Sequence, residues 1–298
     1  MEELVFTENT MTERKKKSII LLTLSAIALL ALIIWTAWGN TALELNTYTV
    51  TSNELPSAFD GCRIAHISDL HNAEIGDGNE KLLAMLREAE PDNIAITGDL
   101  IDSRRTNIDI ALAFAEQVME IAPCYYVPGN HEARISAYLE LRTGLENLGV
   151  VVLENGREIL TVSGETIAIY GMKDPSFPME LVDDSMATNV GNLLNSFWVE
   201  GDGFTILLSH RPELFETYVK RDADLVLTGH AHGGQFRLPF VGGLVAPNQG
   251  FFPKYDSGLY ADGNTNMVVS RGIGNSLFPF RFNNRPEVIL IELESSNE

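Results

Sequence analysis

The sequence predicts an α/β fold with two sheets, preceded by one membrane-spanning helix. Short buried runs typical of strands alternate with amphipathic helical segments between residues 63 and 127, which indicates parallel strands with helices packed on them. Further strand-like runs between residues 150 and 293 are sufficient for a second sheet. No linker rich in proline or serine interrupts the chain after residue 45, so we expect residues 45–298 to form a single domain.

The first element is a long apolar segment, Ile19–Trp38, whose polar members are only Thr and Ser. At about 1.5 Å per residue, a helix of this length spans the roughly 30 Å hydrocarbon core of a bilayer. Basic residues Arg14–Lys17 precede it, and the next basic residue is Arg63. The positive-inside rule therefore predicts a single-pass protein of the cell membrane. Its parts would be a cytoplasmic tail (1–17), a transmembrane anchor (18–38) and an extracytoplasmic domain (45–298).

A cleavable signal peptide is the alternative interpretation of this segment. Ala37 and Gly39 are small enough for a cleavage site. The apolar run is nevertheless longer than the roughly 7–15 residues of a secretory signal core. The sequence thus favours a retained anchor.

Composition excludes several functional classes. The chain carries 21 Lys+Arg against 41 Asp+Glu, a net charge of −20, and such a surface repels a phosphate backbone. We therefore expect no nucleic-acid partner. Two distant cysteines provide neither a disulfide framework nor a cysteine–zinc pattern, so Cys62 and Cys124 are expected to be unpaired.

The elements of the domain follow from hydrophobic patterning and turn residues. A short strand is expected at 47–51, and a second at 63–68 follows the Asp60-Gly61 turn. The apolar spacing at 81–89 predicts a helix that ends before Pro91. Beyond it we expect a strand at 93–97, a helix at 108–121, and strands at 124–127, 150–153, 159–162, 166–170, 204–209, 224–227, 267–270 and 288–293.

Polar residues follow five of these strands at the points where they end. In an open α/β sheet the carboxyl ends of parallel strands form one crevice, where ligands bind. We therefore expect these side chains to share a single site. They are Asp69 and His71, Asp99 and Asp102, Asn130 and His131, His210, and finally His230 and His232.

The residue types favour a metal site. Asp, His and Asn supply oxygen and nitrogen ligands suited to Mn²⁺, Fe²⁺ or Zn²⁺. Asp69 and His71 flank Leu70, so an extended chain would present both to the site while Leu70 enters the core. A carboxylate such as that of Asp99 can bridge two ions, and the pattern predicts a dinuclear centre.

In this order, the motifs D-x-H (69–71), G-D-x-x-D (98–102), G-N-H-E (129–132), His210 and G-H-x-H (229–232) resemble those of the calcineurin-like metallophosphoesterases. With the anchor, they are most similar to the bacterial membrane-anchored phosphohydrolases of that superfamily. The resemblance covers residues 45–293 and implies a four-layer αββα sandwich, two mixed sheets flanked by helices. It also implies two divalent metal ions, the first held by Asp69, His71, Asp99 and His232, the second by Asp99, Asn130, His210 and His230.

The implied activity is phosphoester hydrolysis by in-line attack of a metal-bridging hydroxide. The family uses the residue at His131 beside the leaving group, and Asp102 matches the acid that orients it. Ser103 and Pro128 stand where protein phosphatases of the superfamily carry arginines. We therefore expect a phosphodiester or pyrophosphate substrate, envelope-associated or lipid-linked. A phosphomonoesterase and a catalytically silent metal-binding scaffold are the alternatives.

Remaining residues are given structural or specificity roles. His66 is expected to pack near the site, and Glu132 to support its loop. The aromatic segment 277–282, together with Phe251 and Phe252, is interpreted in one of two ways. It forms the edge of the core, or, with Arg281, it flanks the site and receives an acyl chain or headgroup. The segments 172–190 and 236–260 are expected to form the specificity loops.

Overall fold

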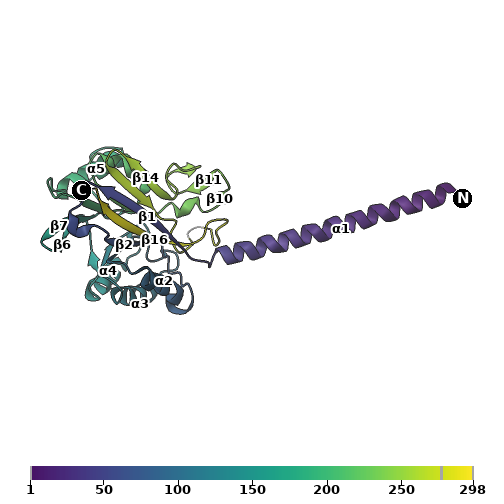
Figure 1. The fold of residues 1–298 in the computed structure, drawn as a ribbon, viewed down its shortest axis with the longest axis horizontal. Helices are drawn as coiled ribbons and strands as arrows, with labels where there is room; N and C mark the ends of the chain where they lie inside the picture. Colours follow the sequence, from purple (N-terminus) through teal and green to yellow (C-terminus); the bar gives the residue numbers. More distant parts are fainter. Residues whose placement is uncertain (1, 276–277, 297–298) are drawn as a thin grey trace.

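Helix α1, Glu2–Gly39, projects from one side of the domain as a single long rod (Figure 1). The computed structural model describes residues 2–275 and 278–296. Within α1, the stretch Lys15–Gly39 is long and apolar enough to cross a membrane, and none of it is buried against the domain. This is the surface that a lipid-facing helix requires, as the sequence predicts.

The first sheet has six strands in the order β1-β16-β2-β3-β4-β5. Strands β2 to β5 are parallel, and β16 pairs antiparallel with β2 and parallel with β1. Continuous burial of β3 and β4 explains their unbroken apolar runs. The strands are β1 Glu44–Ser52, β2 Arg63–Ile67, β3 Asn93–Thr97, β4 Cys124–Val127, β5 Val151–Val152 and β16 Glu287–Ser295.

The second sheet also has six strands, in the order β14-β15-β9-β8-β7-β6. Its centre, from β15 to β7, is parallel, whereas both edge strands pair antiparallel. The strands are β6 Gly156–Val162, β7 Glu165–Gly171, β8 Thr205–Leu208, β9 Leu225–Thr228, β14 Gly258–Asp262 and β15 Thr265–Val269.

Three hydrophobic cores separate four layers. One core lies between the two sheets and joins side chains of both. Another packs three helices on the outer face of the first sheet, and the third packs two helices on the second sheet. The four-layer αββα sandwich of mixed sheets is confirmed. The helices are α2 Glu80–Ala89, α3 Ile108–Met119 and α4 Tyr138–Asn147 on the first sheet, with α5 Met186–Phe197 and α6 Phe215–Val219 on the second.

Two small hairpins stand out between β9 and β14, within the predicted loop 236–260. Strand β10 (Arg237–Leu238) pairs with β11 (Gly242–Gly243), and β12 (Val245–Ala246) pairs with β13 (Gly250–Phe251). Both lie on the side of the domain from which α1 emerges (Figure 1). The other predicted loop, 172–190, runs into the start of α5.

Helices α4, α5 and α6 and strand β14 lack a counterpart among the predicted elements. In α4 only Leu141 and Leu145 are buried, too few apolar positions to mark a helical face clearly. Both cysteines are free, as expected, with Cys124 buried at the start of β4.

Candidate metal centre

The carboxyl ends of β2, β3 and β4 of the first sheet meet those of β8 and β9 of the second. All the predicted ligands gather there, and each is at most 7% exposed. This grouping follows from topology, because parallel strands place their carboxyl ends on one edge. Those brought together are Asp69, His71, Asp99, Asn130, His210, His230 and His232, joined by His131 and Asp102.

The backbone after β2 differs from the predicted extended chain. Asp69 and His71 have φ of 52° and 48°, in the left-handed region, so the prediction of simple alternation is wrong. The reason is that Asp69 N–H donates to the Gly98 carbonyl (3.0 Å) and His71 N–H to that of Asp99 (2.9 Å). These bonds curl the loop around the end of β3. Leu70 is fully buried, as expected. Left-handed non-glycine residues are strained, and such strain concentrates at functional sites.

One group of ligands consists of Asp69, His71 and His232. The two imidazole Nε2 atoms face each other at 3.2 Å, and Asp69 Oδ1 lies 3.2 Å from that of His232. Among the described residues, this buried Oδ1 has no hydrogen-bond partner. A buried carboxylate oxygen without a hydrogen-bond partner is costly in a protein interior, unless a cation lies beside it.

A second group forms around Asp99, His210 and His230. His210 Nε2 lies 3.3 Å from Asp99 Oδ2 and 3.1 Å from His230 Nδ1. Asn130 adds its Oδ1 at 3.2 Å from the same nitrogen. His210 Nδ1 meets the Thr97 carbonyl at 2.7 Å, so that nitrogen carries a proton and Nε2 faces the site, where it would bind an ion once it has lost its own proton.

Charges within the site favour ionised carboxylates. Burial alone would raise the pKa of Asp99, but His210 and His71 lower it well below its ordinary value. Burial disfavours a charged His210, yet Asp99 and Asp69 raise its pKa to about 10. The carboxylates therefore attract positive charge strongly, and here protons supply it. Divalent cations would neutralise the same carboxylates, and the oxygen and nitrogen donors of the site suit such ions.

Glycines bring the loops after β3 and β4 within contact distance. A Cβ on Gly129 would lie 2.3 Å from Asp99 Oδ1, and one on Gly98 would lie 2.6 Å from the backbone of Gly129. Only glycine permits this approach.

His131 receives its hydrogen bond from Ser103, a residue for which the sequence predicted no such role. The Ser103 N–H donates to His131 Nδ1 at 3.0 Å, whereas Asp102 Oδ1 lies 3.5 Å from that atom. Asp102 accepts from Arg104 N, Nε and Nη2 (2.9, 3.1 and 3.1 Å). Asp102 thus shapes the turn that presents the Ser103 amide. Burial lowers the pKa of His131 to about 4, so the ring is neutral and its proton resides on Nε2.

Glu132 connects the two central loops. Its fully buried carboxylate accepts from Asp99 N and Gly129 N (2.9 and 2.8 Å) through one oxygen and from Leu100 N and Ile101 N (2.7 and 3.3 Å) through the other. Burial, reinforced by the charge of Asp99, raises the pKa of Glu132 to about 7. The amide donors offset the cost of holding this group in the interior. The expected supporting role is thus confirmed in the structure.

Replacing Glu132 by glutamine is expected to weaken metal binding about 10–100-fold and to destabilise the domain by about 1–3 kcal/mol. The glutamine NH₂ would face amide donors at one oxygen position and leave them unsatisfied. Calorimetric metal titration and thermal unfolding measure both effects. Glu146→Gln, an exposed change beside Arg142 (3.0 Å), is the control. Unchanged metal affinity in Glu132→Gln would contradict this role.

Two asparagines that contact the histidines escaped the sequence analysis. Asn248, from the loop between β12 and β13, lies with Nδ2 3.1 Å from His230 Nε2 and 2.9 Å from Glu213 Oε1. Asn284 donates to the carbonyl of His232 at 2.7 Å. Neither follows a predicted strand, so no pattern in the sequence marked them. His66 instead fits its expected role: it is buried and bonds Thr97 Oγ1 at 2.8 Å.

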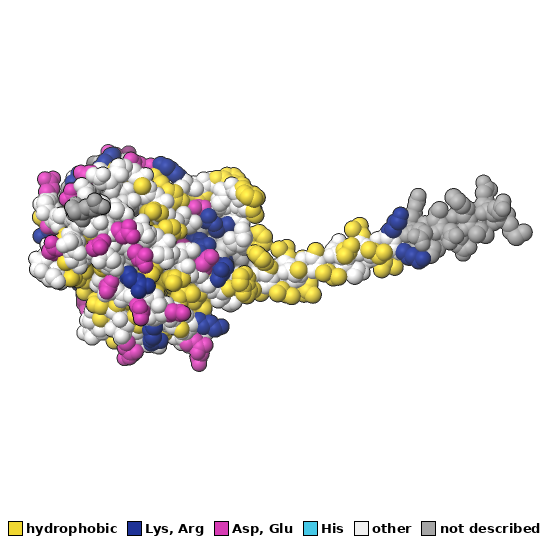
Figure 2. All heavy atoms as spheres, viewed as in Figure 1, with side chains coloured by type: hydrophobic (Ala, Val, Ile, Leu, Met, Phe, Trp, Pro, Cys, Tyr) yellow, Lys and Arg dark blue, Asp and Glu magenta, His cyan; other side chains and the backbone are white. Residues whose placement is uncertain are grey.

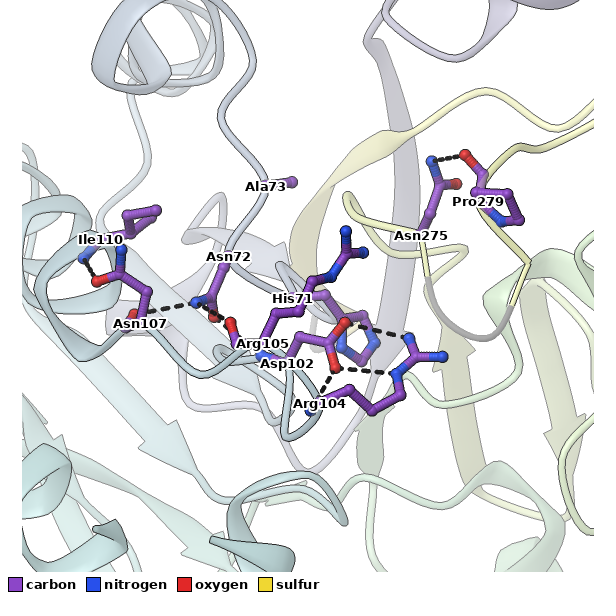
Figure 3. A pocket seen from close by; sticks show the side chains of 10 residues that line it. All are labelled: His71, Asn72, Ala73, Asp102, Arg104, Arg105, Asn107, Ile110, Asn275 and Pro279. Atoms are coloured by element: carbon purple, nitrogen blue, oxygen red, sulfur yellow. Dashed lines mark hydrogen bonds and ion pairs between the residues drawn. The ribbon is translucent and has the colours of Figure 1, made fainter.

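A cavity of about 530 Å³ opens beside His71. Figure 3 shows the Arg105 side chain extending into its middle, while Arg104 is paired with Asp102 at one wall. Within the described part of the chain, the Arg105 guanidinium has no carboxylate partner. This cation is positioned to meet an anion that enters beside the ligands. The other lining residues are Asn72, Ala73, Asn107, Ile110, Asn275 and Pro279.

The aromatic segment agrees only in part with its predicted role. Arg281 is 2% exposed and donates to the Arg271 and Gly274 carbonyls, so the prediction that it receives a headgroup is wrong. Phe278 and Phe280 are 41% and 45% exposed and pack edge-on against Phe236. Both rings are therefore accessible to a ligand at the rim of the cavity, beside its lining residue Pro279. Leu277 lies outside the described residues.

The family model described as calcineurin-like phosphoesterase matches residues 62–234, more than half of the chain. The chain belongs to this family. The metallophosphoesterase is therefore a metal-dependent phosphoester hydrolase, and divalent metal ions are implied at the site described above. Together, the complete donor set and the family leave no missing ligand that would indicate a silent scaffold.

Curated relatives extend the similarity over most of this metallophosphoesterase. It is 29% identical to the metallophosphoesterase YkuE of Bacillus subtilis, over 86% of this chain and 87% of the relative. It is 28% identical to the phosphodiesterase YaeI of Escherichia coli, over 78% and 82%. A transmembrane protein with a metallophosphoesterase domain from Danio rerio is 30% identical over 82% of this chain, which spans 55% of that relative. With α1, the similarity to this transmembrane protein supports a membrane protein.

Proposed function

We propose that the chain is a dinuclear phosphodiesterase or pyrophosphatase, anchored by α1 with its domain outside the cytoplasm. The position of Asp99 between the two ligand groups carries this proposal. Asp99 Oδ2 lies 3.6 Å from His71 Nε2 and 3.3 Å from His210 Nε2, so one carboxylate faces both groups. The first ion would be held by Asp69, His71, Asp99 and His232, and the second by Asp99, Asn130, His210 and His230. We propose Mn²⁺, Fe²⁺ or Zn²⁺.

When bound, such ions would polarise phosphoryl oxygens and lower the pKa of bound water toward about 7. Side chains of the protein would supply the proton and bind the rest of the substrate. His131 directs its Nε2 toward the same centre, 4.0 Å from Asp99 Oδ2, and is placed to donate a proton to a phosphoryl or leaving-group oxygen. Arg105 would hold a second anionic group of the substrate in the adjoining cavity. A pyrophosphate has such a group beyond the scissile bond, and a phosphodiester has one when its alcohol substituent is itself anionic.

The experiment that tests this activity starts from metal-free full-length protein in detergent. Mn²⁺, Fe²⁺ or Zn²⁺ is restored singly, and hydrolysis of bis-p-nitrophenyl phosphate and p-nitrophenyl phosphate is measured. We expect metal-dependent cleavage that prefers the diester, with two ions bound per chain. Cleavage of the monoester alone would assign a phosphomonoesterase instead. Binding of fewer than two ions at saturation would contradict the dinuclear centre.

A lipid-linked substrate is part of the proposal. Pro279 lines the cavity, and the neighbouring rings of Phe278 and Phe280 are half-exposed at its rim. The same segment reaches the end of α1, because Arg281 N–H donates to Asn40 Oδ1 at 2.7 Å. The rim aromatics therefore lie close to the level at which the anchor leaves the membrane.

Replacing Phe278 and Phe280 by serine is expected to lower kcat/KM for a lipid phosphodiester by about tenfold or more, because the acyl chain loses apolar contact area. Turnover of bis-p-nitrophenyl phosphate should be unaffected. Leu139→Ser on α4, where the side chain is 68% exposed, is the matched control. An equal loss on both esters would contradict the proposed acyl contact.

A further inference from the structure

Four exposed apolar residues of the two hairpins between β9 and β14 take no part in the metal centre described above. Phe240 and Val241 lie between β10 and β11, and Phe251 and Phe252 lie at β13. Their exposed fractions are 108%, 58%, 74% and 62%, so these four side chains are mostly exposed to solvent. Phe240 and Phe252 also have positive φ, 67° and 55°, a strained conformation for bulky residues. Exposed aromatic groups of this kind mark an interaction surface.

Hydrogen bonds connect both hairpins to the chain just after α1. Asn40 follows the helix directly and bonds the Arg281 backbone with both ends of its amide, at 2.7 and 2.9 Å. The next residue, Phe282, accepts from Arg237 N–H of β10 at 3.0 Å. Phe252 N–H in turn donates to the Leu244 carbonyl at 2.9 Å, which joins the second hairpin to the first. A series of hydrogen bonds therefore links the end of the anchor to both hairpins.

Little chain separates the anchor from the domain. Only residues 40–43 lie between Gly39 and β1, a span of about 14 Å even when fully extended. Arg285 fixes this junction further, with its guanidinium 5.1 Å from the Trp38 ring centroid and a hydrogen bond to the Ala42 carbonyl at 2.9 Å. The side of the domain around the junction must therefore lie at the membrane surface.

The surface on this side suits a bilayer. Figure 2 shows hydrophobic side chains over the projection beside the end of α1, with Lys and Arg side chains nearby. A domain of net charge −20 is otherwise repelled by anionic lipids. Aromatic groups beside cations are the combination that enters a membrane interface.

We propose that Phe240, Val241, Phe251 and Phe252 form a membrane-docking surface. It inserts into the outer interface of the bilayer that holds α1, and it fixes the domain so that the metal centre opens among lipid headgroups. The inference rests on the retained anchor of the proposed function and narrows its substrate class to phosphoesters of membrane lipids.

A site-specific fluorescent label tests the docking without any activity assay. Full-length protein carrying Val241→Cys is labelled with an environment-sensitive fluorophore in nanodiscs of phosphatidylcholine and phosphatidylglycerol that contain doxyl-labelled lipid. Burial raises the pKa of the native thiols of Cys62 and Cys124 to about 11 and about 12, so they react slowly. We expect quenching at position 241 and none for Leu139→Cys on α4, a residue that is 68% exposed. No quenching at position 241, or equal quenching at positions 241 and 139, would overturn the proposal.

A second variant separates docking from catalysis. Phe240→Ser, Phe251→Ser and Phe252→Ser together should abolish the quenching at position 241 and lower kcat/KM for a lipid phosphodiester by about tenfold or more. Hydrolysis of bis-p-nitrophenyl phosphate should be unchanged. Undiminished quenching in this variant would overturn the docking surface. Quenching in a wild-type chain that hydrolyses neither ester would support the surface and refute the proposed activity.

Discussion

Replacing Asp99 by asparagine is expected to reduce phosphodiester hydrolysis by at least about 10³-fold. The side chain belongs to two of the ligand groups, and its Oδ2 faces nitrogens from both sheets. Asparagine preserves the shape and can still accept from His131 N–H, which now bonds Oδ1 at 2.8 Å. What it removes is the negative charge that two cations would share. Metal content should fall from two ions per chain to one or none.

Thermal unfolding with and without metal gives this prediction a second readout. Each site filled at a hundredfold excess over its dissociation constant stabilises the native state by about 2.7 kcal/mol, which raises Tm by several degrees. Wild-type protein should gain this stability on adding Mn²⁺, and Asp99→Asn should lose most of the gain. Asp224→Asn is the matched control, because that buried carboxylate accepts from Thr205 N and Oγ1 (2.9 and 3.0 Å) at the start of β8. An Asp99→Asn protein that still binds two ions would refute the bridging role.

The sequence was sufficient to predict which strands meet and which side chains gather at their ends. Parallel pairing fixes that outcome, because once β2, β3 and β4 lie side by side, the residues after each must share an edge. Local backbone geometry was harder to predict. Asp69 and His71 take left-handed conformations through hydrogen bonds to the loop after β3, and such long-range pairings leave no periodic signal.

Contacts made by irregular segments were also beyond sequence patterning. Asn248 reaches His230 from a hairpin loop, and Arg281 is buried although it lies in a segment rich in exposed aromatics. The burial of Arg281 depends on carbonyls of Arg271 and Gly274 that only the folded chain assembles. The orienting group of His131 escaped notice for a related reason: it is a backbone amide, and every residue but proline has one.

Replacing His131 by alanine is expected to lower kcat about 10²–10⁴-fold while metal content stays at two ions per chain. His131 Nδ1 accepts from Ser103 N–H, so the proton of the neutral ring is directed from Nε2 toward the ligand cluster. His131→Gln should recover part of the lost activity, because its terminal amide can place an N–H near the same point. Ser103→Ala removes the Oγ, which lies 3.2 Å from His131 Nδ1, but keeps the backbone N–H donor at 3.0 Å. Because the backbone donor remains, nearly full activity is expected for this control.

Metal analysis distinguishes this role from direct ligation, because His131 also lies within ligand distance of His71 and Asp99. Loss of one ion in His131→Ala would identify a metal ligand and overturn the donor role. Asp102→Asn should have an intermediate effect, since Asp102 acts through the turn that it holds with Arg104. A loss in Asp102→Asn as large as that in His131→Ala would instead mean that the carboxylate orients the ring directly once substrate is bound. The size of that loss, compared with the Ser103→Ala control, decides which group sets the direction of the His131 proton.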